Sequence, residues 1–218
     1  MKMVTVVRGP TGGVWSRGRP RLSASCGARR DRSRSVAARA SDLDDLLSIV
    51  RGTHRGERVD TGVRQAVENV CDSLASSSAP VKVSETAISK TWRLVFTTEK
   101  ETLFITSNAR NLFGVSTDVE QIIDLRKGRG RLQNLISFAN GAAFIVNSEL
   151  GLDESPSRRA NFKFTDAQVV VPSGSSFGLP PFGKGWFDTL YLSDQYRVAK
   201  DSRGDILVIE SGGEPRFK

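Results

Sequence analysis

The residues that could carry catalytic chemistry are few, and their positions favour other roles. His54 is the single histidine, and it stands beside Arg55 in a loop-like stretch, where a solvated side chain is a more common outcome than a general base. Four aspartates gather near the C-terminus: Asp188, Asp194, Asp201 and Asp205. A pair of carboxylates can act as general acid and base, but capping of turns and pairing with neighbours such as Arg197 and Arg203 is the commoner role of such a group.

Signatures of nucleotide binding, metal binding and covalent catalysis are missing from the sequence. We find no glycine-rich phosphate loop, no zinc-ligand pair and no strand–turn–helix nucleophile elbow. Of the two cysteines, Cys26 lies in the basic N-terminal segment considered next, which leaves Cys71 without a disulfide partner in the rest of the chain. We therefore expect no catalytic residues, no metal site and no cofactor.

The positive charge of the chain is confined to its first fifth. The 218 residues carry 32 Lys and Arg against 24 Asp and Glu, a formal net charge of +8. Residues 1–40 hold ten of the basic residues and a single acid, whereas residues 41–218 hold 22 basic and 23 acidic residues. A net charge of −1 on the larger part argues against a nucleic-acid partner.

Residues 1–40 have the composition of an organelle-targeting segment. They are rich in Arg, Ser, Ala and Gly, and they lack the apolar run of a secretory signal. Glycines and prolines between residues 9 and 20 disfavour the regular amphipathic helix of a mitochondrial presequence. We therefore predict a disordered chloroplast transit peptide over residues 1–40, removed between Cys26 and Ser41. The alternative is a disordered basic arm that binds RNA or anionic lipid.

Residues 41–218 are enough for one domain with one core, and two helices are expected at its start, within residues 42–77. Ser41 stands where an N-cap would, and Asp60 or Thr61 can cap the second helix. Each helix carries one apolar stripe at helical spacing: Leu43, Leu46, Leu47 and Val50 in the first, and Val63, Val67, Val70 and Leu74 in the second. No apolar stretch approaches the roughly 20 residues that span a bilayer, so we expect a soluble or peripheral product.

From Thr91 the apolar pattern changes from a helical to an alternating period. Short alternating runs, separated by Gly, Asn and Pro, continue to about residue 211. The last two, Asp194–Lys200 and Asp205–Glu210, read as a hairpin with its turn at residues 202–204. We therefore predict an antiparallel barrel or sandwich over residues 90–211 and not a βαβ fold.

The most unusual stretch runs from Phe177 to Asp194. Its Leu179-Pro180-Pro181 must be extended, because a residue before proline is pushed out of the helical region. Gly183 and Gly185 then allow a sharp turn, and aromatic residues follow. The segment could be a plug that closes a barrel or the rim of a ligand pocket, and the residues leave both interpretations open.

Several of these tracts resemble one known family, the plastid lipid-associated proteins, also called plastid fibrillins. Thr91–Thr98 is similar to the first strand of that family, Val119–Asp124 to its glutamine-isoleucine-aspartate strand, and Leu135–Phe138 to the strand after it. The most specific match is to a C-terminal signature: Leu179, Pro180, Pro181, Gly185, Trp186, Asp188, Tyr191, Asp194 and Arg197. The resemblance extends from Leu43 to Ile209.

The resemblance implies a mainly β (α+β) fold, in which two N-terminal helices precede a lipocalin-like antiparallel β-barrel. It implies no catalytic residues. It also implies that the protein associates with plastoglobules, thylakoids or stroma, and that it binds or organises isoprenoids or other lipids there. Related lipocalins have a glycine two residues before the first-strand tryptophan, where this chain has Lys90. The candidate residues for lining the barrel are Trp92, Leu94, Phe96, Ile123, Phe138 and Phe144. Each of these could instead simply fill the core.

Two functions remain open at this point. The first is a non-catalytic plastid protein that binds or organises isoprenoids or lipids at plastoglobule or thylakoid surfaces as a peripheral protein. The second is a scaffold or assembly protein, with a filled barrel, that binds a plastid biosynthetic or photosynthetic complex. A packed interior with an exposed apolar patch would favour the second. An enzyme acting on lipids is disfavoured, because no nucleophile and base can be paired.

Overall fold

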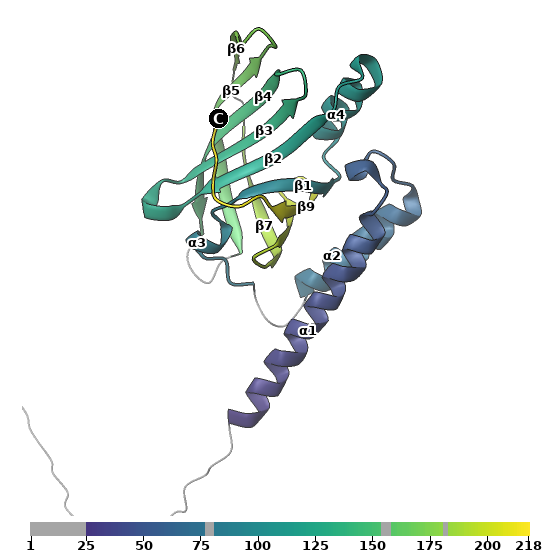
Figure 1. Cartoon of the computed structure of the whole chain (residues 1–218). Coiled ribbons are helices and arrows are strands. Elements are labelled where there is room, and N and C mark those ends of the chain that lie inside the picture. Colours follow the sequence, from purple (N-terminus) through teal and green to yellow (C-terminus); the bar gives the residue numbers. More distant parts are fainter. Residues whose placement is uncertain (1–24, 77–80, 154–157, 181–182) are drawn as a thin grey trace, which may run out of the picture.

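The computed structural model describes residues 25–76, 81–153, 158–180 and 183–218, and it forms a β-barrel with helices on one side (Figure 1). The first half of α1 projects away from the barrel in Figure 1. The elements are α1 (Ser25–Val50), η1 (His54–Gly56), α2 (Thr61–Ser76), α3 (Glu85–Ile88), β1 (Thr91–Thr97), α4 (Lys100–Phe113), β2 (Thr117–Asp124), η2 (Arg126–Gly128), β3 (Arg131–Phe138), β4 (Ala143–Leu152), β5 (Arg159–Val170), β6 (Ser176–Leu179), β7 (Lys184–Leu192), β8 (Tyr196–Asp201) and β9 (Ile206–Ser211).

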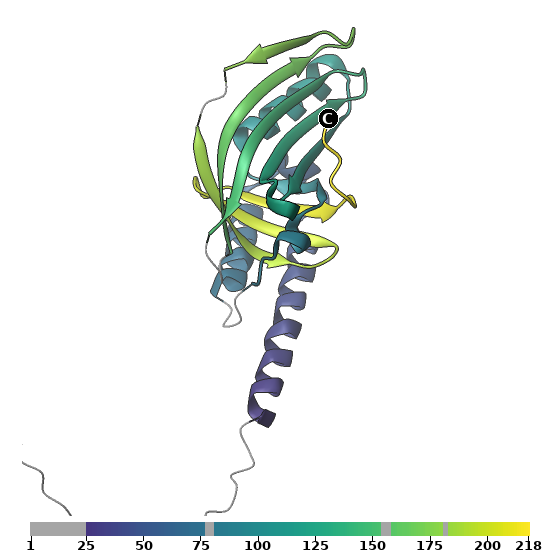
Figure 2. The ribbon, with the colours of Figure 1, turned by 90° about the vertical axis from the view of Figure 1, so that its left-hand side faces the viewer.

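Eight antiparallel strands close on themselves, as the alternating sequence pattern predicts. They pair in the order β4-β3-β2-β1-β9-β8-β7-β5, and β4 also pairs with β5, which completes the ring. The short strand β6 adds to the upper part of β5, so it lies at one end of the barrel (Figure 2). The C-terminal hairpin is confirmed, with Tyr196–Asp201 paired to Ile206–Ser211. The predicted lipocalin-like antiparallel barrel is therefore confirmed.

The pleat of each strand sends alternate side chains into the barrel and onto its outer wall. One buried cluster fills the base of the interior and includes Trp92, Ile123 and Phe187. The short helix α3 lies against this base, where the indole nitrogen of Trp92 donates a 2.9 Å hydrogen bond to the carbonyl of Ile88. A second cluster lies on the outer wall of β2, β3 and β4, where it packs with Phe217 of the C-terminal tail.

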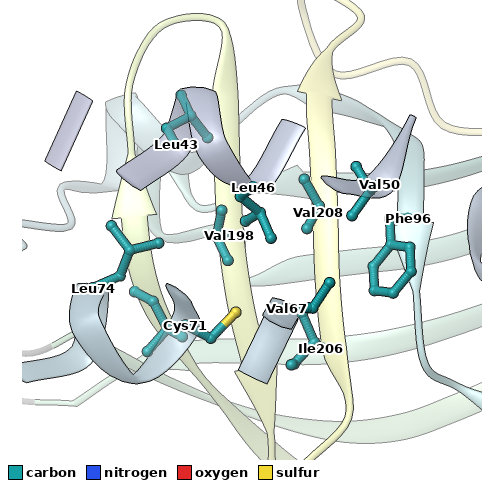
Figure 3. Packing of buried hydrophobic residues seen from close by; sticks show 11 residues of the cluster. Leu43, Leu46, Val50, Val67, Cys71, Leu74, Phe96, Val198, Ile206 and Val208 are labelled. Carbon is teal, nitrogen blue, oxygen red and sulfur yellow. The ribbon is translucent and has the colours of Figure 1, made fainter. Parts of the chain in front are cut away.

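The apolar stripes predicted for the first two helices pack on the outer wall of the barrel. Figure 3 shows α1 and α2 lying over Val198 and Val208. Leu46 and Cys71 are fully buried between the helices and the strands. Burial also raises the pKa of the Cys71 thiol to about 12, so this side chain is part of the core and not a reactive group. The expected helix–barrel packing is confirmed.

The start of the first helix differs from the prediction. Ser41 does not cap it, because α1 is continuous from Ser25 to Val50 and passes through the last residues assigned to the transit peptide. Residues 25–40 contain no proline and are rich in Ala and Arg, which have high helix propensity, so the backbone has no reason to stop at Ser41. The expectation of disorder is wrong for residues 25–40; residues 1–24 lie outside the described part of the chain. Removal of residues 1–40 in the plastid stays a prediction.

The other helices show what the sequence pattern did and did not reveal. The second helix begins as predicted, because the carboxylate of Asp60 accepts a 2.8 Å hydrogen bond from the backbone N–H of Val63. Helix α4 was not predicted. Its apolar residues are interrupted by Thr, Ser and Asn, which favour turns as much as helices, and it ends at Gly114 in the left-handed conformation.

The turn between α1 and α2 is held against the barrel by a close backbone approach. Gly56 has φ +104°, and a Cβ atom added there would collide with the carbonyl oxygen of Thr97 on β1. Gly52, in the same connection, has φ +78° but nothing within 4 Å of an added Cβ. Of these two glycines, Gly56 alone combines a left-handed backbone with a contact that admits no side chain.

We predict that Gly56→Ala lowers the free energy of unfolding by about 3 kcal/mol, because the turn must move away from β1 and the helices lose part of their packing. The matched control Gly52→Ala should cost about 1 kcal/mol, since it changes only the backbone preference. Urea unfolding of the two variants, followed by circular dichroism, measures the difference. Equal losses in the two variants would show that the close approach at Gly56 contributes nothing.

Candidate functional site

The interior of the barrel is only partly filled, and two cavities remain above the packed base. One, of about 150 Å³, lies beneath α4 and is walled by apolar residues such as Leu94, Val146 and Ile105. The other, of about 270 Å³, is walled by Phe162 and Phe187 among others. Five residues line both cavities, which makes them neighbouring parts of one interior space: Glu99, Gln121, Asn134, Phe164 and Leu207.

The candidate lining residues fall in four different places. Leu94 and Phe144 line the smaller cavity. Trp92 and Ile123 are fully buried in the base of the barrel, where they pack with other core residues and line neither of these two cavities. Phe138, at the end of β3, lies outside both cavities, and it lines an apolar groove at the rim.

Phe96 does not line the interior, and a β-bulge is the reason. Leu94 of β1 pairs with Ile209, but Phe96 pairs with Val208, so the register shifts by one residue between them. The shift turns the side chain of Phe96 to the outer wall, where it packs with Val208 beneath the helices (Figure 3). A strict two-residue alternation could not anticipate this reversal.

A polar row crosses the otherwise apolar interior. Nη1 of Arg197 on β8 donates a 2.6 Å hydrogen bond to Oε1 of Gln121 on β2. Nε2 of Gln121 in turn donates to Oδ1 of Asn134 on β3 at 3.1 Å. Gln121 and Asn134 were missed as site residues, although their alternation with Ile123 and Leu132 places them on the inward faces of their strands. Arg197 was identified only as part of the signature.

The mouth of the larger cavity is charged. Glu99 stands at the start of α4, and burial raises the pKa of its carboxyl group, although a 2.9 Å hydrogen bond from Thr102 opposes that shift. Lys184 and Arg203 line the same opening with Asp201 and others. The space therefore has a charged mouth and aromatic walls, and Arg197 lies on its inner wall.

Most residues of the C-terminal signature hold the fold together. Asp188 accepts hydrogen bonds of 2.8 and 3.0 Å from Nε and Nη2 of Arg159, whose guanidinium lies 3.6 Å from the ring centroid of Trp186. Gly185 leaves room for the ring of Phe162, since a Cβ added there would lie 2.7 Å from the ring. Tyr191 packs against the buried residues between the barrel and helices α1 and α2.

The remaining signature residues lie at the two ends of the barrel. Asp194 accepts a 3.3 Å bond from Nζ of Lys90, and this lysine stands 5.6 Å from the ring centroid of Trp92. Lys90 thus covers the base of the barrel in the position where lipocalins have glycine. Leu179 and Pro180 are exposed near the opposite end, and Pro181 lies outside the described residues.

The contacts of Asp201 and the position of Ser176 indicate structural and not catalytic roles. Asp201 accepts 2.8 Å hydrogen bonds from the backbone N–H groups of Arg203 and Asp205, which fixes the turn between β8 and β9. Ser176 sits in the letters of a nucleophile motif, Gly-Ser-Ser-Phe-Gly, but it begins strand β6 and no helix follows it. Within the described residues, no group of three potential metal ligands is found, and no helix is both long and apolar enough to cross a bilayer.

Comparison with known proteins agrees with this architecture. The family model PAP_fibrillin matches residues 42–210. Probable plastid-lipid-associated protein 11, chloroplastic, of Arabidopsis thaliana is 39% identical over 168 residues, which are 76% of this chain and 76% of the relative. No solved structure matches the chain. The match is in line with the plastid localisation that the basic N-terminus predicts. The chain belongs to the PAP/fibrillin family of plastid lipid-associated proteins.

Proposed function

We propose that this protein is a non-catalytic lipid carrier or organiser of the plastid, which holds one apolar chain of an isoprenoid or fatty acid inside its barrel. The observation that carries the proposal is the partly empty interior, with cavities of about 150 and 270 Å³ behind a common set of lining residues. A space of this size suits one chain and not two. Each methylene that leaves water contributes about 0.8 kcal/mol to binding.

An apolar groove on the outside borders this interior. A groove of about 460 Å³ runs between α4 and the end of β5, where Val169 and Pro172 contribute to its wall. Ile105 and Phe144 line both this groove and the smaller cavity. We assign the entry of a lipid chain to this place, between α4 and β5, where a movement of the two shared side chains would join the groove to the cavity away from the charged mouth.

The same end of the molecule presents apolar side chains to its surroundings. Phe104 on α4 is 70% exposed, and Phe177 on β6 is 59% exposed. Figures 1 and 2 place α4 and β6 at the same end of the barrel. Large exposed apolar side chains of this kind mark contact surfaces. Because they lie near the apolar groove, this face is assigned to contact with a lipid surface, such as a plastoglobule or thylakoid membrane, and not to a plastid protein complex.

Filling the cavity should abolish lipid uptake. Val146 faces the interior from β4, so Val146→Trp is expected to occupy the smaller cavity and weaken binding of farnesol by the full chain at least tenfold. Glu149→Trp, exposed on the outside of the same strand, is the matched control and should bind like the wild type. Calorimetric titration measures both, alongside mass spectrometry of lipids that copurify. A wild-type protein that neither carries lipid nor takes up farnesol would refute the proposal.

The exposed phenylalanines should anchor the protein to a lipid surface. The double variant Phe104→Ser, Phe177→Ser is expected to reduce cosedimentation with phosphatidylcholine vesicles at least tenfold, since burial of two aromatic rings drives the association. Val146→Trp serves as the control here, because an occupied interior leaves this face intact. Unchanged sedimentation of the double variant would leave the exposed face available for a protein partner instead.

A further inference from the structure

The arginine inside the barrel is bonded on only one side of its guanidinium. Arg197 has no exposed surface and borders the larger cavity. Nη1 donates to Gln121, but Nε and Nη2 are buried and have no hydrogen-bond acceptor among the described residues. An unpaired N–H in such a place loses its hydrogen bond to water and gains nothing in return. A hydrogen-bond acceptor at these two nitrogens would therefore be favourable, and the described side chains do not supply one.

The positive charge of Arg197 is also uncompensated within the barrel. No carboxylate among the described residues forms an ion pair with it, and its guanidinium lies over the neutral ring of Phe187, whose centroid is 4.5 Å from Cζ. Burial lowers the pKa of Arg197 to about 9, which leaves the guanidinium cationic at neutral pH. A buried cation without a counter-ion is strongly unfavourable, so the site is suited to receive an anion.

The geometry selects a carboxylate among the anions. Nε and Nη2 form one edge of the planar guanidinium, and their two N–H groups run parallel at the spacing of the two carboxylate oxygens. Arg197 is the fully buried cation of this cavity, whereas Arg203 at the mouth already lies 3.6 Å from the carboxylates of Asp201 and Asp205. The single charge of Arg197 balances the one negative charge of a carboxylate but not the several charges of a diphosphate. Gln121, held by Asn134, keeps the opposite edge occupied and so fixes the orientation of the plane.

The rest of the cavity suits a chain that follows the head group. Phe162, Phe164 and Phe187 wall the larger cavity around Arg197. Glu99 lies at the other side, beneath α4, where it offers no positive charge to a carboxylate. The charges therefore favour a molecule with its acid at Arg197 and its apolar end toward α4.

We propose that the barrel binds a single-chain carboxylic acid, with Nε and Nη2 of Arg197 donating to its two oxygens and its chain lying along the aromatic wall. This inference rests on the proposed function, because it names the lipid class that the same cavity accepts. A straight acyl chain and an isoprenoid chain share this head-group chemistry. The experiment below separates the two.

The test compares acids with the alcohols of the same chain on the full-length protein. Calorimetric titration at neutral pH uses dodecanoate against dodecan-1-ol, and farnesoate against farnesol. We expect the wild type to bind at least one acid tenfold or more tightly than its alcohol, and the acid that does so identifies the chain. Arg197→Met, which keeps the length and removes the charge, should abolish the difference between acid and alcohol.

A second variant guards against a loss of folding in Arg197→Met. Gln121→Glu places a carboxylate beside Nη1, which neutralises the guanidinium while leaving it in place. It should weaken acid binding at least tenfold more than it weakens alcohol binding, and circular dichroism confirms the fold of both variants. Equal affinities for acid and alcohol in the wild type, or a difference that persists in Arg197→Met, would overturn the inference and leave the proposed function standing. Failure of all four probes to bind the wild type would overturn both.

Discussion

The pairing of β4 with β5 is the interaction on which the rest of the structure depends. It runs from Ala143 opposite Val170 to Leu152 opposite Ala160, and it joins the two ends of what would otherwise be an open sheet. Because the barrel is closed, the interior faces of its strands cover one another and need no second domain to shield them from water. The register shifts at Asn147 and Ser148, where one extra residue of β5 lets the strand bend around the barrel. Without this ladder there would be neither a cavity nor an inward position for Arg197.

Helices and the C-terminal tail cover some parts of the outer wall and leave others exposed. The covered parts serve the fold, and the exposed end is the part assigned to function. Helices α1 and α2 shield β8 and β9, and the C-terminal tail packs Phe217 on the outer faces of β2 to β4. The end near α4 and β6 has no such cover within the described residues, and the exposed side chains of Phe104 and Phe177 lie on these elements. The base is sealed by α3 and Lys90, so access to the interior belongs to the opposite end.

Much of the fold can be predicted from the sequence, because helices and strands leave a periodic pattern of apolar residues. The prediction fails where that pattern is interrupted. The stripes of α1 and α2, the alternating strands and the C-terminal hairpin all follow from spacing alone. Phe96 could not be placed, because a bulge after Leu94 reverses the inward and outward sides. The start of α1 at Ser25 was hidden by a composition that reads equally well as a targeting segment and as a helix rich in Ala and Arg. The pairing of Arg197 with Gln121 joins strands 76 residues apart, which no local pattern reports.

The placement of Arg197 also connects ligand binding with folding. Apolar residues of similar size would fill the same position without the cost of desolvating a charge, so stability alone does not account for an arginine there. A ligand that supplies the missing anion stabilises the folded state by its own binding free energy, because the unfolded chain offers no such site. Under the proposed acid-binding role, the empty barrel carries the unfavourable charge and the loaded barrel does not. The same cation that weakens the empty protein then makes the barrel bind an acid more tightly than an equally apolar alcohol. The aromatic wall by itself cannot distinguish the two, because it contacts only their apolar chains.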